Sequence, residues 1–224
     1  MTDEVRRLLA MQVSRDRVRI VLDGGEELTL ALESLPAELP TDGSAIGESI
    51  GSPLLAEIRL AAQRKEVARR LMAMLDRRLL PVARIRRKLI EEGFTPEAVE
   101  GVLEQMQARG VHSDRAYAAA YCRDRLAGRP VGRRYLQQKL REKQVPAEVA
   151  AEVVAEVLDA ETEKELAVEA ARRKWRAVGA ADQRKGEQKV ARHLQSRGFP
   201  AHLVWDAVRR GRPSATETTE GEMT

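Results

Sequence analysis

The first third of the chain alternates apolar and polar residues in two short segments. Apolar side chains occupy every second position in 17–22 and again in 28–32, which is the period of a β-strand with one buried face. Asp23-Gly24-Gly25 lies between the two segments and provides the positive φ values that a tight hairpin turn requires. The pattern therefore predicts two antiparallel strands joined by a short turn.

A third strand is expected before these two, because Leu9, Met11 and Val13 follow the same two-residue period. Three short strands form a sheet that is only marginally stable alone and needs a helix over its apolar face. The glycine- and proline-rich stretch that follows predicts a loop. Residues 1–53 are therefore expected to form a small β-rich segment that ends in a connector.

From about residue 54 the apolar spacing changes to that of a helix. An amphipathic helix is predicted over about 54–78, and its apolar stripe recurs at every fourth position, at Val67, Leu71, Leu75 and Leu79. The helical period then continues to about residue 211.

The helical part repeats a short motif three times. The segment 88–96 has counterparts at 139–146 and at 193–200, in which Leu89 corresponds to Leu140 and to Leu194. In each copy a basic helix ends, an apolar residue follows that can pack back over the helix end, and a proline opens the next helix. The first and third copies place glycine at the helix end, whereas the middle copy has Gln144 there. A further helix precedes each pair, so the unit is three helices in about fifty residues.

The predicted fold is mainly α, with three tandem three-helix repeats in an elongated array after a small N-terminal antiparallel sheet. The repeats are expected at 54–111, 112–159 and 160–211, with an insertion at about 178–185 before the last copy. The tail 212–224 is rich in Ser, Thr and Glu and is expected to be disordered. Only 3% of residues are aromatic, which favours several small helical cores over one deep core.

No catalytic or metal-binding arrangement is recognisable in the sequence. His112, His193 and His202 are scattered, lack metal-ligand spacing, and are expected at the surface or in loops. Cys122 follows Tyr121 within a predicted helix, so a buried small hydrophobe is expected rather than a nucleophile. We therefore expect no enzyme, no cofactor and no metal.

The single cysteine excludes an internal disulfide and fits a reducing cytosol. Neither a membrane-length apolar run nor a signal peptide is recognisable. The expectation is a cytoplasmic monomer without membrane contact.

The net charge of +4 is distributed unevenly. Cations dominate between Arg115 and Lys143, and acidic residues dominate between Val145 and Ala170. Stacked repeats would align the basic helices into a stripe that meets a DNA backbone or an acidic groove. Alternatively, the basic helices neutralise acidic neighbours in adjacent repeats, and the sequence leaves both interpretations open.

The candidate contact residues for a macromolecular partner are inferred from charge, with one aromatic residue added. Tyr135 lies among cations and would stack on a partner or fill a seam between helices, whereas Tyr117, Tyr121, Trp175 and Trp205 are expected in the core. The candidates are Arg84, Arg87, Lys88, Arg123, Arg125, Arg129, Arg133, Arg134, Tyr135, Lys139, Lys189 and Arg192.

Three recurring motifs resemble the RecX family of bacterial RecA regulators. They are Arg-Arg-Lys-Leu-x-x-x-Gly-Phe-x-x-x-x-Val at 86–99, Gly-Val-x-Ser-Asp-x-x-Tyr-x-x-x-Tyr-x-Arg-x-Arg at 110–125, and Arg197-Gly198-Phe199 followed by Val204. The order of the copies carries the resemblance, since each motif alone is weak. The chain departs from the family pattern at 80–85 and at Gln144.

The resemblance implies a cytoplasmic regulator of recombination, DNA repair and the SOS response. Its expected partner is the RecA recombinase as a filament on single-stranded DNA. Binding is expected mostly to inhibit ATP hydrolysis, filament extension and strand exchange. The alternative is a basic helical module that binds DNA directly.

Overall fold

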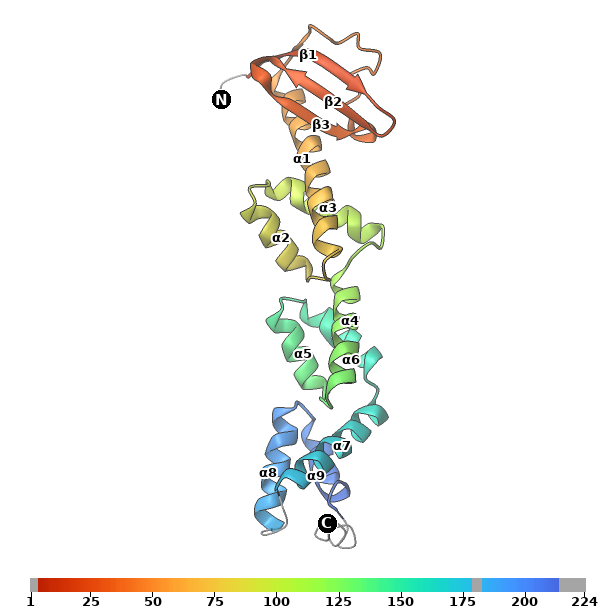
Figure 1. Cartoon of the computed structure of the whole chain (residues 1–224), viewed down its shortest axis with the longest axis vertical. Helices are drawn as coiled ribbons and strands as arrows, with labels where there is room; N and C mark the ends of the chain where they lie inside the picture. The colour runs from red at the N-terminus through yellow and green to blue at the C-terminus, as the bar shows by residue number, and fades with distance from the viewer. Residues whose placement is uncertain (1–3, 179–182, 214–224) are drawn as a thin grey trace, which may run out of the picture. The chain divides into compact units, whose positions relative to one another are not determined.

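The computed structural model describes residues 4–178 and 183–213, in two compact units, Met1–Val111 and His112–Thr224. Figure 1 shows the course of the chain through the β-strands and the helices that follow. The predicted disordered tail, from residue 214 onward, and the centre of the predicted insertion, 179–182, lie outside the described residues. The two units are described one at a time.

The first unit begins with a four-stranded antiparallel sheet in the order β3-β2-β1-β4. Its strands are β1 (Arg6–Val13), β2 (Arg17–Leu22), β3 (Glu27–Ala31) and β4 (Ser49–Ile50). Single turns of 3₁₀-helix follow β2 and β3, at Asp23–Gly25 and Leu32–Ser34. The predicted alternation is confirmed in β2, where Val18, Ile20 and Leu22 are fully buried. The sequence pattern did not predict β4, because its two residues lie within the glycine-rich stretch.

The predicted apolar face of β1 is confirmed at Met11, which packs against the core of the sheet, and is wrong at Leu9 and Val13. Leu8 is the fully buried residue of this strand, whereas Leu9 is 51% exposed. Leu8 pairs with Leu22 and Ala10 pairs with Val21, so Leu9 is an extra residue that shifts the register. Such a β-bulge breaks the strict two-residue period on which the prediction depended.

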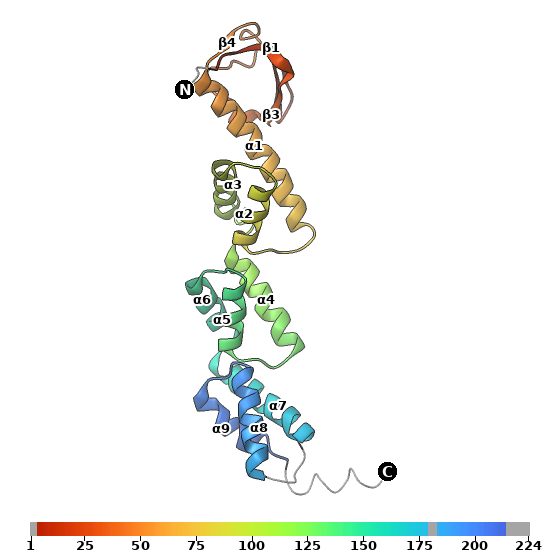
Figure 2. The same ribbon diagram turned by 90° about the vertical axis from the view of Figure 1, so that its left-hand side faces the viewer.

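Helix α1 (Ser52–Leu75) contributes to two hydrophobic cores of the first unit. Leu55 and Ile58, near its start, pack with the buried face of the sheet, and Figure 2 shows the helix covering that face. Val67 and Leu71, farther along, pack with α2 (Val82–Glu91) and α3 (Pro96–Ala108). The helix ends three residues earlier than predicted.

The apolar stripe predicted for this helix is wrong at its last position. Leu79 lies beyond the helix end and is 46% exposed, whereas Leu80 is buried in the core of α1–α3. The chain leaves the helix after Leu75, so the four-residue period no longer sets which side chains turn inward.

The second unit contains two further sets of three helices, each around its own core. The first set consists of α4 (Asp114–Gly128), α5 (Arg133–Glu142) and α6 (Ala147–Val157). The second set consists of α7 (Ala160–Val178), α8 (Gln183–Ser196) and α9 (Ala201–Arg210). With α1–α3 these sets confirm the predicted mainly helical fold of three-helix repeats.

The two tryptophans differ in their placement. Trp175 lies in the core of α7–α9, as predicted, and its indole N–H donates to the carbonyl of Val208 at 3.1 Å. The prediction for Trp205 is wrong, since its side chain is 50% exposed. It follows the buried Val204 by one position on α9, which turns it about 100° away from the buried face.

The second helix of each repeat ends in the same hydrogen-bonded turn. The residue with positive φ is Gly93 (95°) in the first repeat, Gln144 (65°) in the second and Gly198 (79°) in the third. In the middle copy the Gln144 N–H donates to the Arg141 carbonyl at 2.8 Å, and the Val145 N–H donates to the Leu140 carbonyl at 3.1 Å. Equivalent bonds close the other two turns, the pattern of a Schellman motif.

Gln144 therefore keeps the turn at a steric cost that its glycine counterparts avoid. The left-handed conformation costs a non-glycine residue roughly 1–2 kcal/mol. A glycine avoids this cost but loses more backbone entropy on folding, which offsets part of the gain. We expect Gln144→Gly to raise the free energy of unfolding by about 1 kcal/mol, measured by chemical denaturation followed by circular dichroism. Gln144→Ala is the control and should leave stability almost unchanged, because alanine retains the Cβ. Equal stabilisation by both variants would contradict the backbone explanation.

Candidate functional site

The candidate contact residues are divided between the two units. Arg84, Arg87 and Lys88 lie on α2 in the first unit. The other nine lie in the second unit, on α4, α5 and α8 or between α4 and α5. The candidate contact residues therefore lie in separate local groups.

On α2, the three candidates have different surroundings. Arg84 is partly buried, and Arg87 is exposed with its Nε 3.7 Å from Glu91. Lys88 helps to line a cavity of about 300 Å³ together with residues of α1 and Glu92. A carboxylate thus lies close to two of these three cations.

In the second unit, Tyr121 of α4 is surrounded by cations. The Arg125 Nε–H donates to the Tyr121 hydroxyl at 3.1 Å, and the Arg125 guanidinium carbon lies 5.2 Å from the ring centroid. Lys143 follows α5 in the chain, and its ammonium lies 5.4 Å from the centroid of the same ring. Each contact has cation–π geometry, which contributes about 0.5–1 kcal/mol at an exposed site.

Tyr135 of α5 repeats this arrangement beside Tyr121. The Lys139 ammonium lies 5.8 Å from its ring centroid and donates to Glu142 at 2.7 Å, a bond that raises the pKa of Lys139. Tyr117 stacks on Tyr121 with 6.3 Å between ring centroids. These rings pack against the core of α4–α6 but are only partly buried. We call this group the tyrosine–cation patch: Tyr117, Tyr121, Arg125, Tyr135, Lys139 and Lys143.

Arg133 joins the two helical repeats of the second unit. Its backbone N–H donates to one carboxylate oxygen of Glu163 at 2.7 Å, and its Nε–H donates to the other at 2.5 Å. Glu163 is only 1% exposed, so removing its cation would leave a buried charge without compensation. The guanidinium of Arg133 is therefore engaged within the chain.

A backbone seam lies beside this ion pair. The Gly132 N–H donates to the Arg197 carbonyl at 2.9 Å, and the Arg134 N–H donates to the Gly198 carbonyl at 3.2 Å. A Cβ on Gly198 would lie 2.2 Å from the Tyr135 nitrogen, so the two main chains approach as closely as glycine allows. We call these contacts, with the Arg133–Glu163 pair, the repeat seam.

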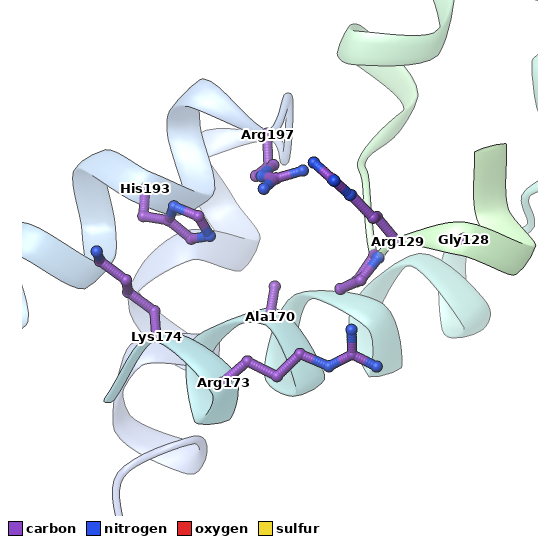
Figure 3. A pocket seen from close by; sticks show the side chains of 8 residues that line it. Gly128, Arg129, Ala170, Arg173, Lys174, His193 and Arg197 are labelled. Carbon is purple, nitrogen blue, oxygen red and sulfur yellow. The ribbon is translucent and has the colours of Figure 1, made fainter. Parts of the chain in front are cut away.

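The remaining candidates lie outside the tyrosine–cation patch. Arg129 lines a separate pocket with residues of α7 and α8, shown in Figure 3. Arg123, Arg134, Lys189 and Arg192 have exposed side chains.

The side chains considered for catalysis or metal binding are placed as follows. Cys122 is fully buried, as predicted, and burial raises the pKa of its thiol to about 11. His193 is half-buried and His202 is exposed. His112 lies in the short connection before α4, which fits the predicted loop placement, although its side chain is only 5% exposed. Within the described ranges, no three His, Cys, Asp or Glu side chains gather as a metal site would require.

Sequence comparison identifies relatives of this chain. The RecX second three-helix domain matches residues 113–154, and the RecX third three-helix domain matches residues 161–208. A regulatory protein RecX from Neisseria meningitidis serogroup C is 31% identical over 145 residues, which are 65% of this chain and 90% of that relative. The chain belongs to the RecX family.

Solved structures agree with the RecX assignment. A crystal structure of a regulatory protein RecX matches with a TM-score of 0.71 at 25% identity, over 91% of this chain and 98% of that one. RecX from Lactobacillus salivarius matches with a TM-score of 0.61 at 15% identity, over 66% of this chain and 95% of that one, which supports the fold alone. In the described part of this RecX-family chain, no helix has both the length and the apolar character of a membrane span.

Two groups of residues in this RecX-family chain were missed by sequence reasoning. Tyr121 was assigned to the core because its spacing from Tyr117 is helical, yet cations cover its ring. Arg173, Lys174, His193 and Arg197 lie around one pocket although they belong to two helices. The run of cations at 172–174 and the four-residue spacing of His193 and Arg197 were the available signals.

The repeat seam predicts a large difference between two equivalent glycines. Gly198→Ala should lower the free energy of unfolding by about 2–4 kcal/mol, because it adds a backbone clash to the cost of positive φ. Gly93→Ala is the matched control, with a φ of 95° and nothing within 4 Å of its Cβ, and should cost about 1–2 kcal/mol. Denaturant unfolding of both variants measures the difference. Equal losses would show that the close approach at Gly198 contributes nothing.

The burial of Cys122 predicts an unreactive thiol. At neutral pH a maleimide should modify the native chain at least roughly a hundredfold more slowly than the denatured chain, because the thiolate is both scarce and inaccessible. The control places the only cysteine at exposed Ala127 of the same helix, as Ala127→Cys with Cys122→Ala. Rapid modification of native Cys122, followed by mass spectrometry, would contradict this burial.

Proposed function

We propose that this chain binds the RecA filament on single-stranded DNA and lowers its ATP hydrolysis, filament extension and strand exchange. Membership of the RecX family, whose curated relative is named a regulatory protein, supports a regulatory role. The observation that carries the proposal is the tyrosine–cation patch, which lies within the segment that matches the RecX second three-helix domain. It is the surface that we assign to the filament.

The chemistry of the patch suits a partner with acidic and planar groups. Arg125, Lys139 and Lys143 provide positive charge, and long-range attraction by such charges speeds association and weakens as salt rises. Partly exposed tyrosine rings add apolar contact area at low entropic cost, and aromatic residues and arginine are frequent anchors of protein interfaces. Since a filament repeats its surface, contact with two protomers at once would gain from effective concentration.

Direct binding to single-stranded DNA is the second candidate, and the same patch favours it. Proteins that bind single strands combine cations for the backbone with aromatic rings on which bases stack. Tyr121 and Tyr135 are accompanied by cations in this way. The two functions differ in whether RecA is needed for binding.

The test is the DNA-dependent ATPase of RecA from the same organism, measured on preformed filaments. The wild-type chain should inhibit at less than one molecule per RecA. Arg125→Glu with Lys139→Glu should require roughly tenfold more protein for the same inhibition, as expected from losing about 1.4 kcal/mol of binding free energy. These positions avoid Arg133, whose reversal would break the repeat seam. The control is Arg15→Glu with Arg17→Glu, two exposed residues of the first unit.

Unchanged hydrolysis with the wild-type chain, together with no complex on the filament, would refute the RecA proposal. Fluorescence anisotropy with naked oligothymidylate separates the second candidate. If the patch variant loses DNA binding and inhibition in parallel, and excess free DNA abolishes inhibition, direct DNA binding is the function. If the variant loses inhibition while DNA binding persists, the patch contacts RecA.

A further inference from the structure

A basic pocket of about 360 Å³ lies where the two helical repeats of the second unit meet. Three separate segments form it: the residues that follow α4, the middle of α7 and the end of α8 (Figure 3). Five of its lining residues have basic side chains. We call them the junction pocket: Arg129, Arg173, Lys174, His193 and Arg197.

The junction pocket gathers positive charge with little compensation. Among the lining residues that the structure describes, none is acidic. Arg173 forms an ion pair with Glu169 on its own helix, but no described carboxylate lies within 4 Å of the charged atoms of Arg129, Lys174 or Arg197. In Figure 3, Arg129 and Arg197 point toward one another from opposite sides, with the His193 ring beside Arg197.

His193 is half-buried among these cations. Burial and the neighbouring cations Arg197 and Lys174 together lower the pKa of its imidazole. Like charges held this close destabilise one another, and an anion placed among them would relieve that repulsion. The neutral ring also keeps one nitrogen N–H able to donate.

The repeat seam holds the pocket in place. The Arg197 carbonyl accepts from Gly132, three residues after Arg129, so the two arginines are attached to segments fixed against each other. The ion pair between Arg133 and the buried Glu163 connects α5 to α7 nearby. A site whose segments are already held in position loses less entropy on binding.

We propose that the junction pocket binds a phosphate group. Arginine forks match phosphate oxygens with two parallel hydrogen bonds, and a lysine adds a point charge. The described lining has no Phe, Tyr or Trp ring, so its contacts to a ligand would come mainly from charged and hydrogen-bonding groups. The phosphate belongs either to the backbone of a single-stranded nucleic acid or to a free compound such as a nucleotide. This inference goes beyond the proposed function, because it requires no RecA and uses residues outside the tyrosine–cation patch.

The test uses the isolated full-length chain and two probes, inorganic pyrophosphate and a short oligothymidylate. Nuclear magnetic resonance follows the imidazole signals of His193 and the Nε–H signals of the pocket arginines during each titration. A saturable movement of these signals is expected with at least one probe. Arg129→Gln with Arg197→Gln should weaken that binding roughly tenfold or more, because two charge-assisted contacts are lost. For the oligonucleotide, the slope of log affinity against log salt should fall by about 0.7 for each phosphate contact removed.

Three further variants control for charge and folding. Arg172→Gln removes an exposed cation of α7 that does not line the pocket, and it should leave binding unchanged. Arg129→Lys with Arg197→Lys keeps the charge and should retain part of the affinity. Lys174→Gln should weaken phosphate binding, and Lys174 makes none of the contacts of the repeat seam. The conclusion therefore does not depend on a single variant. Circular dichroism checks that each variant is folded.

The outcomes are distinct. If the His193 and arginine signals move at lower concentrations of oligothymidylate than of pyrophosphate, the phosphate comes from a nucleic-acid strand. Movement with pyrophosphate alone identifies a free phosphate compound. No saturable movement with either probe, or equal weakening by Arg172→Gln and by the double glutamine variant, would overturn the proposal. The patch variant, Arg125→Glu with Lys139→Glu, should still bind pyrophosphate, which separates this result from the test of RecA inhibition.

Discussion

A single residue with positive φ at the end of the second helix sets the geometry of each repeat. This residue reverses the direction of the chain in a turn that two backbone hydrogen bonds close. The next apolar residue, such as Val145 or Phe199, is thereby placed in the core. A proline then stands at the N-cap or the first position of the third helix, where its missing N–H breaks no hydrogen bond within the helix. In the third repeat the same residue also packs against the backbone of Tyr135 in the preceding repeat. One backbone conformation thus connects local structure, the repeat cores and the seam that shapes the junction pocket.

Much of the fold could be predicted from the sequence, since regular periods of apolar residues report buried faces directly. The alternation in β2 and the threefold recurrence of the helix-ending motif both correspond to observed structure. The failures occur where an irregular feature breaks the period. The bulge at Leu9 leaves that side chain exposed, and the early end of α1 exposes Leu79. Such features depend on tertiary pairing, which a one-dimensional pattern does not contain.

The candidate site was less accessible to sequence reasoning, because charge alone does not say which cations are engaged within the chain. Arg133 and Arg134 are adjacent and chemically identical, yet the side chain of one is paired with buried Glu163 and that of the other is exposed. Tyr121 shows the converse difficulty: helical spacing placed it in the core, although Arg125 lies four residues farther along the same helix, and only the approach of α5 brings Lys143 over its ring. The junction pocket combines segments that are distant in sequence, so no local motif marks it.

The shared helix of the first unit has a consequence for how such chains can vary. The sheet buries Leu55 and Ile58 near the start of α1, and α2 and α3 bury Val67 and Leu71 farther along. The same helix thus belongs to the core of the sheet and to the core of the first repeat. A relative that lacked the sheet would have to replace the apolar side chains on the first turns of this helix or cover them with another partner. Loss of the N-terminal strands alone would therefore expose the apolar side chains at the start of α1 to water.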